Sequence, residues 1–296
     1  MGERFSCAAR AQEDRDQLLG TATPVRGYLL VEEPGPWGPG AVPASRLGET
    51  TTARLREVAA ARGVKLLLVR RPDAAGRDPG GPRRLFLADC RRGRTRLRTR
   101  LSPLDALTAA VAEDGGWQDA TGPLLLVCTH GRKDWCCAVR GRPVVTALAA
   151  LDATAVWECS HLGGDRFAAT ALSLPGGAVH GHLAPGDASA LLAAVRAGRV
   201  LPDRLRGRCG DAGVVQAAEG HARLLLGEDR LDAFTPLHAA RLPEGPDGRV
   251  RWRVRFDVHG PLEVDLAEGR APAHRLTCSA GTAQQARTWE LLELRR

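Results

Sequence analysis

The chain has 296 residues, 44% of them hydrophobic, and it carries a formal net charge of +8. This length and apolar fraction predict two or three domains with sizeable cores, and the longest apolar runs are far short of the roughly 20 residues that cross a bilayer, which excludes a transmembrane helix. The charge comes from arginines interleaved with acidic and apolar residues, and only 4% of the residues are aromatic, so the pattern argues against a nucleic-acid partner and favours a surface that docks an acidic redox protein.

The first part of the chain predicts one folded lobe without ligands for a metal. Residues 1–15 are polar and lack the apolar stretch of a secretory signal, so we expect a cytoplasmic protein. The elements that follow are, in order, strand 27–32, helix 51–62, strand 65–69, a hairpin of strands 84–88 and 95–100, and helix 103–112.

The middle of the chain repeats this order of elements. It predicts strand 123–128, helix 139–151, strand 154–158, a hairpin of strands 167–174 and 178–183, and helix 188–197. A parallel crossover followed by an antiparallel hairpin is what a thioredoxin-like sheet requires. We therefore predict an α/β protein with two tandem thioredoxin-like lobes, the first over residues 1–118 and the second over residues 119–203. Aligning the two copies places Glu32 opposite Cys128.

A third, smaller α+β unit is predicted over residues 204–296. An arginine- and glycine-bearing connection, residues 201–210, marks its boundary. The predicted elements after it are helix 214–226 and strands 249–258, 262–266, 274–278 and 288–294. Cysteines and histidines are scattered singly here, Cys209 and Cys278 among them, so this unit predicts no chemistry of its own.

The cysteines are concentrated in the second lobe. Eight are present in a chain without a secretory signal, where a disulfide framework is disfavoured and clustered thiols indicate metal or redox chemistry. Four of them fall within 32 residues, together with His130 and His161: Cys128, Cys136, Cys137 and Cys159. This is the densest group of soft ligands in the sequence.

These residues belong to two loops that follow neighbouring parallel strands, so we expect the loops to face each other at one edge of the sheet. Cys128 ends the first strand, and Cys136 and Cys137 begin the next helix, whose amino terminus lowers the pKa of a nearby thiol. The second loop, residues 159–165, contains Gly163 and Gly164, which allow backbone N–H groups to approach inorganic sulfide closely.

Three kinds of site remain open on these residues alone. Paired soft ligands on two loops fit a binuclear iron-sulfur cluster with one iron for each loop. Zinc is the rival metal, in a zinc-stabilised binding module, but the nine positions from Cys128 to Cys137 exceed the usual spacing of a zinc-binding pair. A thiol oxidoreductase without metal is the third, although the chain has no Cys-x-x-Cys motif.

Several motifs resemble the sucrase/ferredoxin-like family, which is related to the thioredoxin-like 2Fe-2S ferredoxins. They are Cys-Thr-His-Gly at 128–131, the Cys-Cys pair at 136–137 and Ser-His-Leu-Gly-Gly-Asp-Arg-Phe-Ala at 160–168, and the likeness extends to 20–22, 33–38 and 288–291. The resemblance implies a 2Fe-2S cluster held by two cysteines of the first loop and two histidines, four positions apart, of the second. These positions are Cys128, Cys137, His161 and the one occupied by Asp165.

The fourth ligand is open between Asp165 and Cys159, and Cys136 is a rival to Cys137. A carboxylate oxygen matches a cluster less well than a thiolate, and Cys159 lies on the same strand face as His161, which slightly favours Cys159. Either choice gives mixed Cys and His ligation, which raises the reduction potential and can couple electron transfer to a proton. We expect an electron carrier with an unidentified donor and acceptor, and no sucrase activity, since no pair of carboxylates is placed for glycosidic cleavage.

Overall fold

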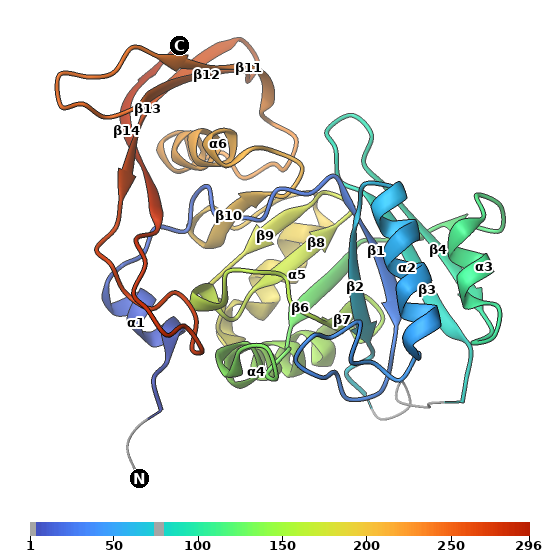
Figure 1. Cartoon of the computed structure of the whole chain (residues 1–296). Helices are drawn as coiled ribbons and strands as arrows, with labels where there is room; N and C mark the ends of the chain where they lie inside the picture. The colour runs from blue at the N-terminus through green and yellow to red at the C-terminus, as the bar shows by residue number, and fades with distance from the viewer. Residues whose placement is uncertain (1–3, 74–79) are drawn as a thin grey trace.

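The computed structural model describes residues 4–73 and 80–296. Within these residues the chain forms six α-helices, one ten-stranded sheet and one four-stranded sheet, as Figure 1 shows. The mixed α/β class expected from the sequence is confirmed.

The first half of the large sheet has one parallel and three antiparallel pairings. Its elements are β1 (Gly27–Glu32), α2 (Glu49–Ala61), β2 (Lys65–Arg70), β3 (Arg83–Asp89), β4 (Arg96–Ser102), α3 (Leu107–Ala112) and the short edge strand β5 (Gln118–Asp119). Strand β1 pairs in parallel with β2 and antiparallel with β3, and β3 pairs antiparallel with β4. The resulting order is β2-β1-β3-β4.

The second half has the same pairing pattern. Its elements are β6 (Leu124–Cys128), α4 (Trp135–Asp152), β7 (Val156–Cys159), β8 (Ala171–Leu174), β9 (Ala178–His180), α5 (Ala188–Arg196) and β10 (Leu205–Arg208). Strand β6 pairs in parallel with β7 and antiparallel with β8, which gives the order β7-β6-β8-β9. The halves join where β2 and β7 pair antiparallel, with Val69 opposite Cys159.

Both faces of the large sheet are buried, which is why its central strands are continuous apolar runs. Alternate residues of one face, such as Leu30 and Leu126, form a single core that both halves share. On the other face each half has its own core, Leu29 packing with α2 and α3 and Leu125 with α4 and α5. The shared core places the carboxyl ends of β6 and β7 next to β2 of the first half.

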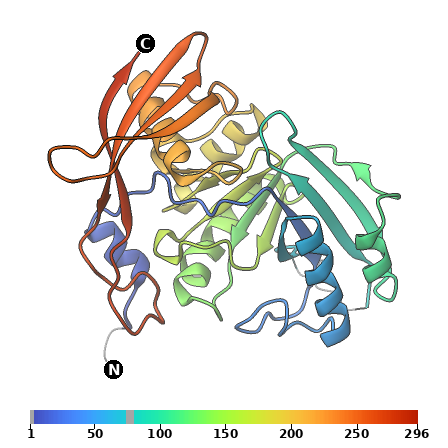
Figure 2. The ribbon, with the colours of Figure 1, turned by 45° about the horizontal axis from the view of Figure 1, so that its top comes forward.

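The C-terminal part is a four-stranded antiparallel sheet covered on one face by a helix. It consists of α6 (Gly213–Leu226), β11 (Thr235–Leu242), β12 (Arg251–Asp257), β13 (Pro261–Arg270) and β14 (Arg287–Arg295). Helix α6 lies between this sheet and β10, as Figures 1 and 2 show. Its buried alanines pack against Phe234, Phe256 and Trp289.

Several elements differ from the sequence-based expectation. Helix α1 (Cys7–Glu13) and strand β11 were not predicted, and residues 205–208, expected in a connection, form β10 and extend the large sheet beyond residue 203. Residues 274–278, expected as a strand, contain only one isolated bridge, His274 to Gln284. These elements depend on contacts with distant segments, which local periodicity does not record.

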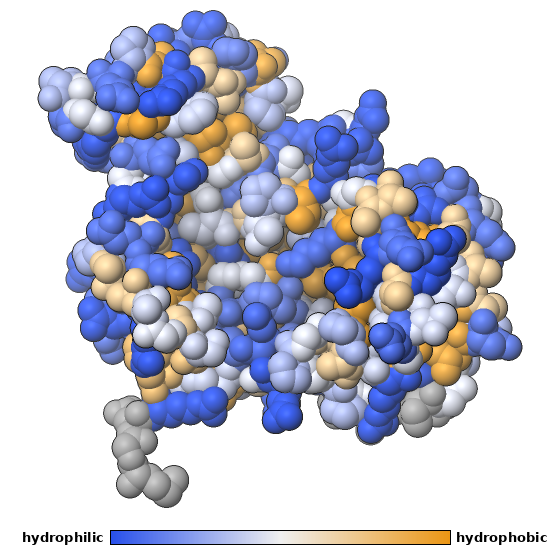
Figure 3. All heavy atoms as spheres, in the orientation of Figure 1, coloured by the Kyte–Doolittle hydropathy of each residue, from blue (hydrophilic) through white to orange (hydrophobic). Residues whose placement is uncertain are grey.

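The face of the molecule drawn in Figure 3 is predominantly polar. Apolar side chains are scattered among the hydrophilic ones on this face. None of the helices in the described part of the chain is long and apolar enough to cross a membrane.

Candidate metal centre

The first loop is held at the junction of β6 and α4. Cys128 is the last residue of β6, and Gly141 allows α4 to approach it closely, because a Cβ at Gly141 would lie 2.3 Å from the carbonyl oxygen of Cys128. Helix α4 begins at Trp135, earlier than expected, where the Asp134 carboxylate accepts a hydrogen bond from the backbone N–H of Cys136 at 3.0 Å. Cys137 therefore lies in the first turn of α4.

The structure brings together three of the predicted ligands. The donor atoms of Cys128, Cys137 and His161 all lie within 4.8 Å of one another. Both thiols are buried, whereas the side chain of His161 is 28% exposed. A hydrogen bond from Cys137 and a second from His161 lower the pKa of Cys128 well below its ordinary value, against the opposing effect of burial. Cys128 is thus the thiol that ionises first.

Asp165 completes this group from the second loop. Its Oδ1 atom lies 3.1 Å from Nδ1 of His161 and accepts a hydrogen bond from the Cys137 thiol at 3.4 Å. Burial raises the pKa of Asp165, but these two contacts outweigh it and lower the pKa overall. Burial lowers the pKa of His161, while Asp165 and Cys128 together raise it to about 9. The four side chains therefore form one coupled polar group.

The other candidate residues lie outside this group. Cys159 is fully buried and is the backbone partner of Cys128 in the parallel pairing of β6 and β7, but its thiol is not among the clustered donor atoms. Cys136 is directed away from Cys137, and its Sγ atom lies 3.3 Å from that of Cys278. Nε2 of His130 lies 2.8 Å from the carbonyl oxygen of Gly38, so this histidine links the two halves of the large sheet.

Two cations, the partly buried Lys65 and the fully buried Arg206, hold the second loop. The Lys65 ammonium donates a hydrogen bond to the Leu162 carbonyl at 3.1 Å, and the Arg206 guanidinium donates one to the Gly163 carbonyl at 2.9 Å. Gly163 and Gly164 have positive φ angles of 101° and 76°, a backbone that favours glycine. A Cβ at Gly164 would lie 2.2 Å from the Arg206 guanidinium. The glycine pair thus makes room for this arginine.

A largely buried ion pair between Arg70 and Glu158 supports the first loop. Arg70 donates two hydrogen bonds to Glu158, at 2.9 and 2.5 Å, and the Thr129 hydroxyl donates a third to the same carboxylate at 2.7 Å. Thr129 directly follows Cys128 in the chain. Arg70 comes from β2 of the first half, so the half without ligands positions the loop that carries Cys128.

The ligand loops were predictable from the sequence, but the residues that fix the second loop in place were not. Lys65 and Arg206 lie 97 and 43 positions from the carbonyls that they bind. No local motif marks either residue, and both are recognisable only once the strands are paired.

Two thiols, an imidazole and a carboxylate on two facing loops are a donor set for a transition metal. Thiolate and imidazole bind both iron and zinc, so the side chains by themselves are compatible with a single ion or with a cluster.

Comparison with known sequences identifies the family of the chain. The family's sequence profile, described as sucrase/ferredoxin-like, matches residues 18–207, which contain both ligand loops and almost the whole of the large sheet. No curated protein and no solved structure matches the chain. With nearly two thirds of its length matched, the chain belongs to the sucrase/ferredoxin-like family.

Proposed function

We propose that Cys128, Cys137, His161 and Asp165 hold a 2Fe-2S cluster and that the protein carries electrons. The observation that carries this proposal is the convergence of four donors from two facing loops in a sucrase/ferredoxin-like chain. The two thiols belong to the first loop, and the imidazole and carboxylate belong to the second. Each loop thereby offers one pair of ligands, as two irons require.

Asp165 is the fourth ligand in this proposal because it already contacts two of the other three residues. The buried Cys159 thiol lies outside the group of donors, although a thiolate is the softer ligand. An aspartate in place of a second histidine adds negative charge beside the cluster. We therefore expect a lower reduction potential than a ligand set with two cysteines and two histidines would give.

The surrounding charges suit an anionic cofactor. Lys65, which is partly buried, and Arg206, which is fully buried, are cations hydrogen-bonded to backbone carbonyls of the second loop. Both balance negative charge from thiolates, sulfide and carboxylate in a region with little solvent. Their fixed positions also limit rearrangement of the loop when the charge of the cofactor changes by one electron.

In this account each half of the large sheet is a thioredoxin-like lobe. The predicted domain limits of residues 1–118, 119–203 and 204–296 stay a prediction, except that β10 joins the large sheet across the limit at residue 203. Glu32, at the end of β1, occupies the position that Cys128 has at the end of β6. The first lobe therefore has no thiol at this position, and it supplies Arg70 as a support for the ligand loop. The protein acts as an electron carrier in a reducing compartment, the cytoplasm, and not as a hydrolase.

An acidic redox protein is the partner that the surface favours. Arg132, Lys133 and Arg142 are exposed around the first ligand loop. A shallow groove of about 290 Å³ lies beside them, lined also by Trp37 and His130. Exposed cations near the partly exposed His161 would steer an acidic surface towards the point where the cofactor is nearest to solvent.

The choice of the fourth ligand can be tested with three variants of the full chain, purified anaerobically. We expect Cys159→Ser to keep the visible absorption and the paramagnetic signal of the reduced cluster, and Asp165→Asn to lose or destabilise both. Asp165→His should keep the cluster and raise its midpoint potential, because a neutral imidazole replaces an anion. Loss of the cluster in Cys159→Ser but not in Asp165→Asn would contradict the assignment.

A single zinc ion is the second candidate, since the donor atoms of Cys128, Cys137 and His161 lie close enough together for one tetrahedral ion. Iron and acid-labile sulfide lost together in Cys128→Ser support the cluster. Zinc lost in that variant, without iron in the unmodified chain, supports the alternative.

A further inference from the structure

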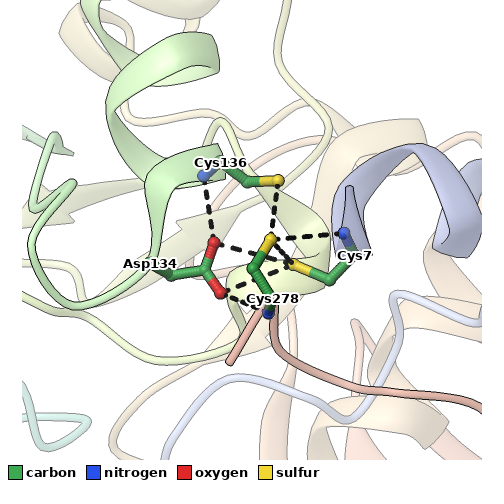
Figure 4. A group of neighbouring side chains, drawn as sticks. All are labelled: Cys7, Asp134, Cys136 and Cys278. Carbon is green, nitrogen blue, oxygen red and sulfur yellow. Dashed lines mark hydrogen bonds between the residues drawn. The ribbon is translucent and has the colours of Figure 1, made fainter. Parts of the chain in front are cut away.

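A second group of metal-binding side chains lies outside the proposed cluster site. The donor atoms of Cys7, Asp134, Cys136 and Cys278 are all within 4.8 Å of one another. The first three residues are almost fully buried and Cys278 is partly buried. Figure 4 shows the three thiols and the carboxylate converging on one point.

These residues come from three segments that are distant in sequence. Cys7 begins α1, Asp134 and Cys136 flank the start of α4, and Cys278 lies in the excursion 271–286 between β13 and β14. Figure 1 shows this excursion descending beside α1. Cys7 and Cys278 both lie outside the residues that match the family profile. The group is therefore a feature of this chain that the family assignment does not cover.

The contacts within the group match the dimensions of a tetrahedral site. The Sγ atom of Cys278 lies 3.3 Å from that of Cys136 and 3.4 Å from that of Cys7, and the Cys7 Sγ atom lies 3.7 and 3.8 Å from the two carboxylate oxygens of Asp134. Zinc–sulfur bonds of about 2.3 Å at tetrahedral angles place sulfurs about 3.8 Å apart. A slight outward movement of the thiols therefore admits one ion.

The groups around the donors are those that stabilise thiolates and orient a carboxylate. The backbone N–H of Cys7 donates to the Cys278 sulfur at 3.4 Å, and the Ser6 hydroxyl lies 3.3 Å from the Cys136 sulfur. The Asp134 carboxylate accepts hydrogen bonds from the N–H groups of Cys136 and Cys278, at 3.0 and 2.7 Å. Such outer contacts fix the geometry of metal ligands. The amino terminus of the long helix α4 also favours negative charge here.

A disulfide accounts for the group less well than a metal does. Cys278 is almost equally distant from Cys136 and Cys7, so a bond to either thiol would leave the other unpaired beside a buried carboxylate. A single ion uses all three thiols and the carboxylate together. The compact arrangement also suits one ion better than a binuclear cluster, which needs room for two irons and two sulfides.

We propose that Cys7, Asp134, Cys136 and Cys278 form a structural zinc site that fastens α1 and the excursion 271–286 to α4. Cys136 and Cys137 are neighbours in the first turn of α4, but their thiols pack in different clusters. Adjacent residues thus serve two separate metals, and the zinc holds the start of α4, which carries a ligand of the proposed cluster.

The test is the metal content of the full chain, purified anaerobically with a thiol reductant in zinc-supplemented medium. We expect one zinc per chain besides the iron. Cys278→Ser and Cys7→Ser should lose zinc and keep iron, whereas Cys128→Ser should lose iron and keep zinc. Cys209→Ser, which alters another buried thiol, should keep both metals. Failure of the cluster proposal and failure of this proposal are therefore separable.

Two further measurements use chains that keep all four ligands. Cobalt added to Cys128→Ser, after a chelator has removed its zinc, should give the intense visible bands and thiolate charge-transfer absorption of a tetrahedral, sulfur-rich site. Removal of zinc from the unmodified chain by a chelator should speed tryptic cleavage after Arg275, which lies in the excursion. Absence of zinc from the unmodified chain, a disulfide involving Cys278, or zinc that leaves with iron in Cys128→Ser would each overturn the proposal.

Discussion

Replacing Gly164 by alanine tests whether the second ligand loop depends on its close packing against Arg206. Gly164 has a φ of 76°, where a residue with a Cβ costs about 1–2 kcal/mol. The added Cβ would lie 2.2 Å from the Arg206 guanidinium. This guanidinium is buried and donates hydrogen bonds to the carbonyls of Thr21 and Gly163, at 2.6 and 2.9 Å. It therefore cannot move away from the added Cβ without breaking one of these bonds.

Displacing the guanidinium breaks at least one charged hydrogen bond, which costs about 1.5–3 kcal/mol. Together with the backbone effect, we expect Gly164→Ala to lower the free energy of unfolding by about 2.5–5 kcal/mol. The matched control is Gly198→Ala, because Gly198 has a similar φ of 66° but nothing within 4 Å of its Cβ position. Its expected loss is the backbone contribution alone, about 1–2 kcal/mol.

Urea denaturation followed by circular dichroism measures both losses, with the metal content of each sample determined in parallel. Gly164→Ala should also bind less iron, because the loop that carries His161 and Asp165 is displaced, while Gly198→Ala should keep its iron. Equal losses of stability in the two variants would refute the close packing of Arg206 against the loop.

Two other substitutions test the supports of the fold. Arg70→Met removes the guanidinium from the buried Glu158 carboxylate, and urea denaturation should show a loss of stability of about 3–5 kcal/mol. The control Arg196→Met breaks a more exposed ion pair with Asp152 and should cost under about 1 kcal/mol. Similar losses in the two variants would contradict the supporting role of Arg70. Burial lowers the pKa of His180 from 6.5 to about 4. On acidification the imidazole therefore takes up a proton in the unfolded chain before it does so in the folded chain. The free energy of unfolding should consequently fall by up to about 3 kcal/mol between pH 6.5 and 4. His180→Gln should remove this contribution from unfolding curves measured over that pH range, and an unchanged acid limb would show that His180 is not buried as a neutral base.

The repeated order of elements and the ligand loops were predictable because both are local. Alternating and continuous apolar runs mark the strands, and Cys128, Cys137 and His161 lie directly after strands or at a helix start, where residues of neighbouring strands must meet. The parallel pairing of Cys128 with Cys159 follows from that order.

The contacts between distant segments were not predictable from periodicity. Helix α1 is short, and Cys7 and Cys278, 271 positions apart, meet only through the excursion between β13 and β14. Singly placed cysteines carry no spacing signal, so these two could not be grouped from the sequence. Cys159 has the expected strand position and packs in the same shared core as Cys128 and Cys137, but its thiol is not among the donor atoms that lie within 4.8 Å of one another.

The most direct test of the central claim is the visible spectrum of anaerobically purified protein together with its iron and sulfide content. The proposed electron carrier requires about two irons and two sulfides per chain, a visible charge-transfer absorption that bleaches on reduction by dithionite, and a paramagnetic signal of the reduced cluster. All of these should disappear in Cys128→Ser. A colourless protein that holds neither iron nor sulfide, even after anaerobic reconstitution, would contradict the account.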